Sequence, residues 1–133
     1  MIDKSNEIFN LVATKLREEF DDITVMGESI DTPSKFPTAT IDETYNVPVE
    51  KDSRTLNEYA HVRYRVQVFS NAKDGKRAEA RRIYGVIDEV LQGINMKCTM
   101  FSTEPEIYNS KIYQITSTYE AVIKEDGTIF RKN

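Results

Sequence analysis

A short loop between a strand pattern and a helix pattern carries the residues closest to a phosphate-binding motif. It reads SNAKDGKR, and its Gly75-Lys76 pair stands where such a loop places glycine and lysine. A working loop also needs an earlier glycine, so that the backbone can wrap the phosphates, and a Ser or Thr after the lysine to bind magnesium. Ser70 and Arg77 occupy those two positions. We therefore interpret the loop as a connection and predict no nucleotide site.

The other side chains that could catalyse a reaction are isolated from one another. His61 is the only histidine, and it alternates with arginines on the polar face of a predicted strand. Cys98 alternates with Met96 and Met100, which is typical of a core thiol. Metal sites need clustered ligands. The close carboxylates, which fit solvated helix-end and loop positions, are Asp21 with Asp22 and Glu104 with Glu106. The sequence predicts no enzyme activity, no cofactor and no metal ion.

Charge is distributed unevenly along a chain whose net charge is −4. The segment from Tyr59 to Arg82, which we call the basic strip, contains many more cations than acids. Its cations are Arg63, Arg65, Lys73, Lys76, Arg77, Arg81 and Arg82, and its acids are Asp74 and Glu79. Such a strip on an acidic protein could meet nucleic acid, an acidic partner protein, or an acidic patch on another copy of the chain.

Length and composition favour one globular domain, residues 1–133. A chain of 133 residues, 39% hydrophobic and 30% charged, is long enough to bury a core and too apolar to be disordered. No apolar run approaches the roughly 20 residues that span a bilayer, and the charged N-terminus is unlike a secretory signal. A single cysteine cannot form an internal disulfide, which fits a reducing compartment.

Periodicity predicts two amphipathic helices, at residues 5–20 and 76–92. The first has an apolar stripe of Phe9, Val12, Ala13, Leu16 and Phe20, with Asp3 or Ser5 as the source of its N-cap oxygen. The second has a stripe of Ala80, Ile83, Tyr84, Ile87, Val90 and Leu91, with Gly93 as the residue just past its end.

Strands are predicted around the helices. The first two cover residues 23–26 and 37–45, and strict alternation in residues 58–70 gives the clearest strand signal. A strand with Met96, Cys98 and Met100 in one row follows, then a turn at Pro105 and a last long strand. Asp126-Gly127 is a hairpin signal before a short return strand at residues 128–130. The predicted fold is α+β: two helices on one face of a mostly antiparallel four- to five-stranded sheet, in the order α-β-β-β-α-β-β.

Residues 46–57 are polar and contain Pro48, so we predict a long mobile loop between two strands. Together with the basic strip, this loop supplies the predicted subunit or partner interface. The interface residues are Arg63, Arg65, Lys76, Arg77, Arg81, Glu50, Asp52 and Arg54.

The segment from Val62 to Met100 resembles the tail terminator and tail completion proteins of long-tailed bacteriophages, which join tails to heads. In that family an alternating strand ends in a short loop with Ser or Asn, and a helix with the run I-x-x-x-[IV]-D-x-[IVL]-L follows. The matching residues here are Val66, Val68, Ser70, Ala78, Ile83, Ile87, Asp88 and Leu91. The order of elements agrees over nearly the whole chain.

This resemblance implies a structural virion protein without a catalytic site. It implies a hexameric ring of identical subunits that caps the tail tube in the phage neck. The implied partners are other copies of the chain, the tail tube protein and the head–tail connector protein, with no membrane and with nucleic acid only as the passing genome. The implied location is the virion, with assembly in the host cytoplasm.

The basic run of the second helix departs from the family pattern, because Lys76, Arg77, Arg81 and Arg82 match none of its motifs. An alternative function therefore remains: a small nucleic-acid-binding module that uses the basic strip, residues 63–82.

Overall fold

Two helices and six strands make up the part of the chain that the structure describes. The computed structural model describes residues 2–49, 59–106 and 109–131. The elements are α1 (Ser5–Glu19), β1 (Thr24–Met26), β2 (Thr38–Val49), β3 (Tyr59–Ser70), α2 (Lys76–Gly93), β4 (Lys97–Glu106), β5 (Asn109–Lys124) and β6 (Ile129–Arg131). The predicted α+β class and the order α-β-β-β-α-β-β are confirmed, and β6 is the short return strand after Asp126-Gly127.

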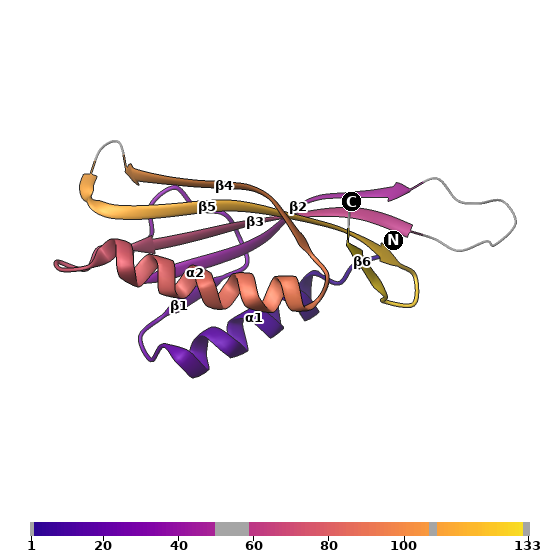
Figure 1. Ribbon diagram of the computed structural model, residues 1–133, viewed down its shortest axis with the longest axis horizontal. Coiled ribbons are helices and arrows are strands. Elements are labelled where there is room, and N and C mark those ends of the chain that lie inside the picture. Colours follow the sequence, from indigo (N-terminus) through magenta and orange to yellow (C-terminus); the bar gives the residue numbers. More distant parts are fainter. Residues whose placement is uncertain (1, 50–58, 107–108, 132–133) are drawn as a thin grey trace, which may run out of the picture.

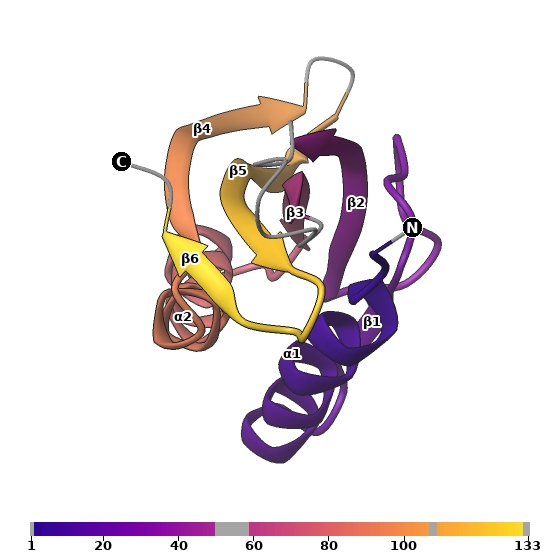
Figure 2. The ribbon, with the colours of Figure 1, turned by 90° about the vertical axis from the view of Figure 1, so that its right-hand side faces the viewer.

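The strands form one sheet in the spatial order β1-β2-β3-β5-β4, and β6 pairs with β5. β1 and β2 run parallel, whereas every other described pair is antiparallel. β6 binds residues 121–123 of β5, just past the last β5 residue that pairs with β4. Strands β4 and β6 therefore follow each other along the same edge of β5. Both helices lie on one side of this sheet (Figure 1, Figure 2).

Each helix buries one apolar stripe against the sheet, as its helical spacing predicts. The facing side chains come from alternate positions of β3 and β5, and they join the helical stripes in one buried cluster. Its members from the helices include Ile8, Val12 and Leu16 of α1 and Ala80, Ile83, Tyr84, Ile87 and Leu91 of α2. Its members from the two central strands include Ala60, Val62, Tyr64, Val66, Val68, Ile115, Tyr119, Ala121 and Ile123.

The hydrogen bonds that cap the N-terminus of α1 come from the residue before the N-cap position. The N-cap residue is Lys4, whose side chain makes no capping hydrogen bond. Asp3 Oδ1 instead accepts hydrogen bonds from the Ser5 hydroxyl (2.6 Å) and the Ser5 backbone N–H (3.0 Å). These two bonds, the hydroxyl first, hold the pKa of Asp3 below its usual value. Of the two predicted residues, Asp3 supplies the oxygen that satisfies the first helical amide.

The end of α2 differs from the prediction for Gly93, which is the last helical residue rather than the one after the helix. The left-handed conformation belongs to Asn95, with φ 68°. The Asn95 N–H bonds the Gln92 carbonyl (3.0 Å), and the Met96 N–H bonds the Leu91 carbonyl (3.0 Å). This pair of bonds is a Schellman motif, in which asparagine takes the position that glycine usually fills.

Two proline-containing segments predicted as loop or turn are in fact strand. Residues 46–49 continue β2 and pair with β3 as far as Tyr59, and the remainder of the predicted loop, 50–57, lies outside the described residues. Pro105 pairs with Tyr113 inside β4, so the predicted turn there is wrong. Proline fits both segments because each has only one neighbour among the described strands, which leaves one edge without a ladder hydrogen bond to lose.

A bulge in β4 turns Met100 away from the core. The register of β4 against β5 shifts between Cys98 and Met100, so Thr99 is an extra residue. The predicted buried row of Met96, Cys98 and Met100 is therefore wrong at its last member. Met96 is buried and Cys98 partly buried, whereas Met100 is 48% exposed.

Candidate interaction surfaces

The predicted basic strip is divided between two sides of the sheet. Arg63 and Arg65 lie on β3 and point away from the helices, because the residues that alternate with them are buried in the core. Lys76, Arg77 and Arg81 lie on α2, across the sheet. The other predicted interface residues, Glu50, Asp52 and Arg54, lie outside the described residues. The strip is thus two separate groups of cations rather than one surface.

On the face of the sheet without helices, Glu120 of β5 contacts side chains of β3, which in turn pack on a side chain of β2. Its Oε1 lies 3.0 Å from His61 Nε2 and 3.4 Å from Arg63 Nη2. The Arg63 guanidinium also lies 4.9 Å from the centre of the Tyr45 ring, and the Tyr45 and His61 rings meet edge to face at 5.5 Å. Glu120 is only 7% exposed, so these partners offset the cost of burying its charge. Both His61 and Arg63 are therefore engaged within the chain.

Beyond that cluster, a segment between β1 and β2 covers the same face of the sheet. Gln67 Nε2 donates to the Ile30 carbonyl (3.0 Å), and Gln67 Oε1 accepts from the Ile30 N–H (2.9 Å). Asp42 accepts hydrogen bonds from the Ser29 N–H (3.1 Å) and hydroxyl (2.8 Å). Arg65, which pairs with Asp42 across the strands, is exposed at the border of this cover.

The cations of α2 are free to meet a partner. Lys76, Arg77 and Arg81 take part in no ion pair between residues that the structure describes. The Arg81 guanidinium lies 5.9 Å from the centre of the Phe101 ring, which is 45% exposed on the edge strand and packs on Tyr84 at 5.1 Å. This end of α2 therefore combines solvent-exposed cations with an exposed aromatic ring.

The loop from β3 to α2 is closed by its own side chains. The Ser70 hydroxyl donates to Glu79 Oε1 (2.7 Å) and accepts a long bond from the Ala72 N–H (3.4 Å). Gly75, with φ 77°, is the N-cap residue of α2. The side chain that stands in place of the phosphate loop's first glycine thus binds the helix's own carboxylate, which agrees with a connecting role.

A chain of hydrogen bonds between buried side chains fixes α2 to the sheet. The Tyr84 hydroxyl lies 2.7 Å from the Tyr119 hydroxyl and 2.8 Å from Ser117 Oγ, which in turn lies 3.3 Å from Cys98 Sγ. The Tyr119 hydroxyl donates to Asp88. Burial raises the pKa of Tyr84 to about 12 and also raises that of Tyr119. Both phenols thus favour the protonated, donating form, and the network serves to position α2.

The first turn of α1 forms a pocket of about 400 Å³ with β2 and β3, and Glu43 and Tyr64 are among its lining residues. Glu43 accepts a hydrogen bond from Asn46 (2.7 Å), but burial raises its pKa. Burial, followed by the nearby Glu43 charge, also raises the pKa of Tyr64. Burial thus disfavours the charged forms of both groups, which suits a structural pocket better than an ion site.

No metal centre or membrane helix is found in the part of the chain that the structure describes. Residues 2–49, 59–106 and 109–131 contain no group of three or more His, Cys, Asp or Glu side chains that could hold a metal ion. Neither of the described helices is long and apolar enough to cross a membrane.

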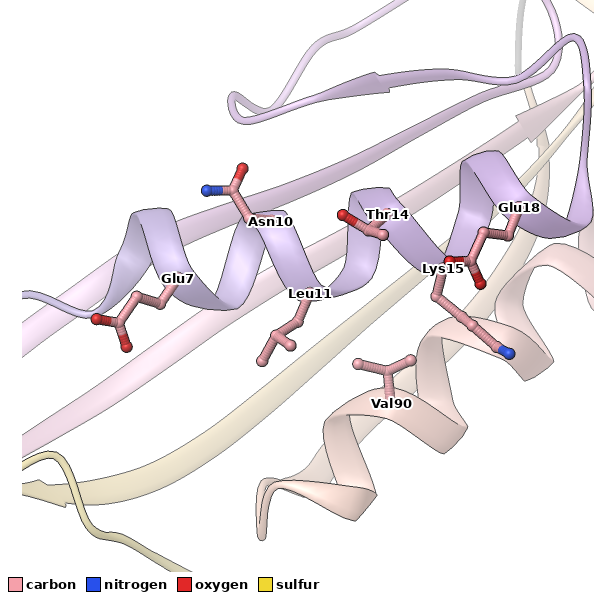
Figure 3. A pocket seen from close by; sticks show the side chains of 7 residues that line it. All are labelled: Glu7, Asn10, Leu11, Thr14, Lys15, Glu18 and Val90. Carbon is pink, nitrogen blue, oxygen red and sulfur yellow. The ribbon is translucent and has the colours of Figure 1, made fainter.

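A shallow groove of about 660 Å³ runs between the two helices on the side away from the sheet (Figure 3). Leu11 of α1 and Val90 of α2 point toward one another across it, and Leu11 is 50% exposed. The remaining lining residues are Glu7, Asn10, Thr14, Lys15 and Glu18. Leu11 lies outside the apolar stripe predicted for this helix, and that position is the signal by which the sequence could have revealed the groove.

The exposed apolar side chains of the sheet were not anticipated from the sequence. Tyr45, Val47 and Phe130 are 38%, 40% and 45% exposed and lie on the same face as Arg63. The alternation of Tyr45 and Val47 in the sequence indicates a strand with one apolar face. This pattern was not recognised because residues 46–57 were interpreted as a loop.

Comparisons with known proteins give a shared fold. No protein-family model matches the sequence, and no curated protein matches it either. Among solved structures 31 chains match. One of them belongs to a structure described as "Virion of native gene transfer agent (GTA) particle". It is 12% identical to this chain, with a TM-score of 0.54, and the match covers 88% of this chain and 84% of the other.

Proposed function

We propose that this chain is a structural protein of a virion, forming a ring in the neck of a tailed bacteriophage. The observation that carries the proposal is the fold shared with a chain of a gene transfer agent virion, over most of both chains. The sequence resemblance to tail terminator and tail completion proteins points in the same direction. The first observation rests on backbone geometry and the second on a residue pattern between Val62 and Met100.

In this role the protein forms a hexameric ring that caps the tail tube and binds the head connector. Its partners are other copies of itself, the tail tube protein and the head–tail connector protein, and the genome passes through the ring. A ring of identical subunits needs two different surfaces on each copy. Two sets of exposed side chains on opposite sides of the sheet suit that requirement: the apolar side chains of β2 and β6, and the cations of α2.

The cations of α2 are the proposed contact with the head connector. The arginine guanidinium can bind a carboxylate through two hydrogen bonds, and such pairs matter most when an interface excludes water. Arg77 and Arg81 are exposed and have no acidic partner among the described residues. An acidic surface on the connector would supply one.

Complementation of a phage that lacks the gene tests this role. The double variant Arg77→Glu/Arg81→Glu should fold, because both side chains are exposed, and tails should still grow. Joining of tails to heads should fail, with a loss of infectious particles of at least about tenfold, because removing one partner of a charge pair buried at an interface costs about 2–5 kcal/mol of binding energy. Arg17→Glu, a reversal at an exposed position of α1, is the matched control and should complement normally. Full yields from the double variant would remove the α2 cations from the joint.

The alternative, a nucleic-acid-binding module that uses residues 63–82, loses support from the division of the basic strip. A duplex-binding surface needs several cations along one face to neutralise successive phosphates. Here Arg63 binds Glu120 on one side of the sheet, while Arg77 and Arg81 lie on the other. Duplex binding whose affinity falls steeply with salt, and less steeply in the double variant, would restore this alternative.

A further inference from the structure

One end of the sheet carries a row of four paired residues, three of them apolar, that crosses four strands. Val47 of β2 pairs with His61 of β3, His61 with Val122 of β5, and Val122 with Phe130 of β6. Directly paired residues point to the same side of a sheet, and His61 points away from the helices, so the whole row does. Three strand spacings make the row roughly 14 Å wide. We call it, together with Tyr45, the sheet-end patch.

The sheet-end patch is open to solvent at a projecting part of the molecule. Tyr45, Val47 and Phe130 are among the few large apolar side chains that the described chain exposes. Figure 1 shows that the ends of β2 and β3, and β6 beside them, extend beyond the ends of both helices. This end of the sheet therefore projects past the helical layer.

The interhelical groove has the dimensions to receive such a row. Its α1 lining runs from Glu7 to Glu18, a length of roughly 16 Å at the helical rise per residue. Its floor is apolar, from Leu11 and Val90, and its ends are acidic (Figure 3). Lys15 does not cancel that charge, because its ammonium lies 3.3 Å from Glu19.

The charged side chains at the two surfaces differ in how far they are paired within the chain. Arg63 and Lys124 border the sheet-end patch with 43% and 30% of their side chains exposed, and each also has an acid of its own chain, Glu120 at 3.4 Å and Asp126 at 4.0 Å. Glu18, at one end of the groove, takes part in no ion pair between described residues. Glu18 is thus the acid of the groove that a partly exposed cation of the patch can meet, and opposite charges at a contact align the two surfaces.

Edge-to-edge pairing of strands is another route by which copies could associate, and the residues of the β4 edge oppose it. Strands avoid edge-to-edge pairing through bulges, proline and lysine. β4 has a bulge at Thr99, a proline at position 105, and Lys97 as its first residue. Continuation of the sheet through β4 is therefore disfavoured.

We propose that the sheet-end patch of one copy packs into the interhelical groove of the next copy. The inference rests on the proposed ring function and identifies the subunit contact within it. The two surfaces differ and lie on opposite sides of the molecule, so the contact is head-to-tail and can be repeated around a ring. Tyr45 and Val47 enter the groove over Leu11, and the exposed part of Arg63 or Lys124 faces Glu18. The cations of α2 then remain available for another protein.

Disulfide trapping tests the contact directly. Val47→Cys and Leu11→Cys are made in separate proteins, each with Cys98→Ser, which keeps a hydroxyl where the thiol lies beside Ser117. Under mild oxidation the mixture should form linked dimers at least tenfold more than either protein alone. The matched control replaces Leu11→Cys by Lys73→Cys, an exposed position in the β3–α2 loop, and should give only background. Tyr45→Cys with Thr14→Cys is a second pair, in case one substitution prevents folding.

The outcomes separate the contact from the ring role. Background linkage in both mixed pairs overturns the inference, and rings of the unmodified protein in negative-stain micrographs would then leave the proposed function intact. Val47→Cys protein that links only to itself also overturns it, because the contact would be symmetric. Selective linkage in the mixture supports the contact even if complementation shows that the protein has no part in joining tails to heads, a result that would remove only the proposed function.

Discussion

The outer face of the sheet, which points away from the helices, has two halves, one covered by the chain itself and one exposed to solvent. Over one half, the segment between β1 and β2 covers Thr40, Gln67 and Phe69, which are 0%, 7% and 0% exposed. Over the other half, Val47 and Phe130 remain exposed although they are more apolar than Thr40 and Gln67. Where the chain covers its own sheet, polar groups are buried with hydrogen-bond partners. Where it does not, apolar side chains are exposed to solvent.

Charge follows the same division. In the covered half Asp42 accepts two hydrogen bonds from Ser29, and Gln67 makes three with Ile30 and Thr40. In the open half Glu120 is satisfied by side chains of the sheet itself, through His61 and Arg63. A polar residue on a strand therefore does not identify a surface as solvent-facing, and an apolar residue does not identify a core.

The largest expected effect on stability is in the apolar core between the helices and the sheet, which supports both halves of the outer face. Ile87→Asp places an unpaired carboxylate under α2, where Ile87 is 0% exposed, and should cost about 4 kcal/mol or more of unfolding free energy. Thermal unfolding by circular dichroism measures it. Arg82→Asp, on the exposed side of the same helix, should change stability by less than about 0.5 kcal/mol. An unchanged melting temperature for Ile87→Asp would mean that α2 does not pack as described.

Gln67→Ala removes the hydrogen bonds that fix the cover to the sheet. It leaves the Ile30 backbone groups and the Thr40 hydroxyl without their partner, a loss of about 1–3 kcal/mol. Arg65→Ala, on the same strand and face but at the open border, should stay within about 0.5 kcal/mol. Urea unfolding of both variants measures the contrast. If Gln67→Ala lost no more unfolding free energy than the roughly 0.5 kcal/mol expected for Arg65→Ala, the cover would contribute nothing to stability.

Tyr84→Phe extends the comparison to the polar network under α2. Removing this hydroxyl leaves Ser117 and Tyr119 each short of a partner, so we expect a loss of about 1–2 kcal/mol at neutral pH. Tyr84 keeps its proton up to about pH 12, whereas the unfolded chain releases it near pH 10. The native protein should therefore lose stability as pH rises from 10 to 12. In Tyr84→Phe this alkaline loss, followed by urea unfolding at several pH values, should be shallower.

The smallest effect on the isolated subunit is expected in the open half. Val47→Thr keeps the shape of the side chain at a position that is 40% exposed, so unfolding free energy should change by less than about 0.5 kcal/mol. The same variant should weaken association between copies, which sedimentation velocity over a concentration series measures. A loss of stability above 1 kcal/mol would mean that Val47 packs within its own chain.

Regular patterns in the sequence predicted the layers of the fold. Strict alternation in β3 and helical spacing in α2 identified which face of each element is buried, because burial of one face repeats at a fixed period. Single-residue interruptions were predicted less well. The bulge at Thr99, the strand position of Pro105 and the left-handed Asn95 each depend on a partner strand or a helix end, which the local residues alone do not specify.

The candidate surfaces were harder to predict because they join residues that are distant in sequence. Arg63 and Arg77 are close along the chain, yet the sheet separates them. Val47 and Phe130 are far apart along the chain, yet strand pairing places them in one row. The basic strip was predicted because its residues are close in sequence. In the structure these residues lie on two different surfaces.

The sequence by itself determined the α+β class, the order of elements and the apolar stripes that form the core, because these follow from local periodicity and the burial of apolar groups. The tertiary structure decided which polar side chains are covered, which apolar ones are exposed, and which charges are already paired. Glu120 shows the reason. Its carboxylate lies between His61 and Arg63 only because β3 and β5 pair in one register. A shift of a single residue would turn every side chain of β5 to the opposite face.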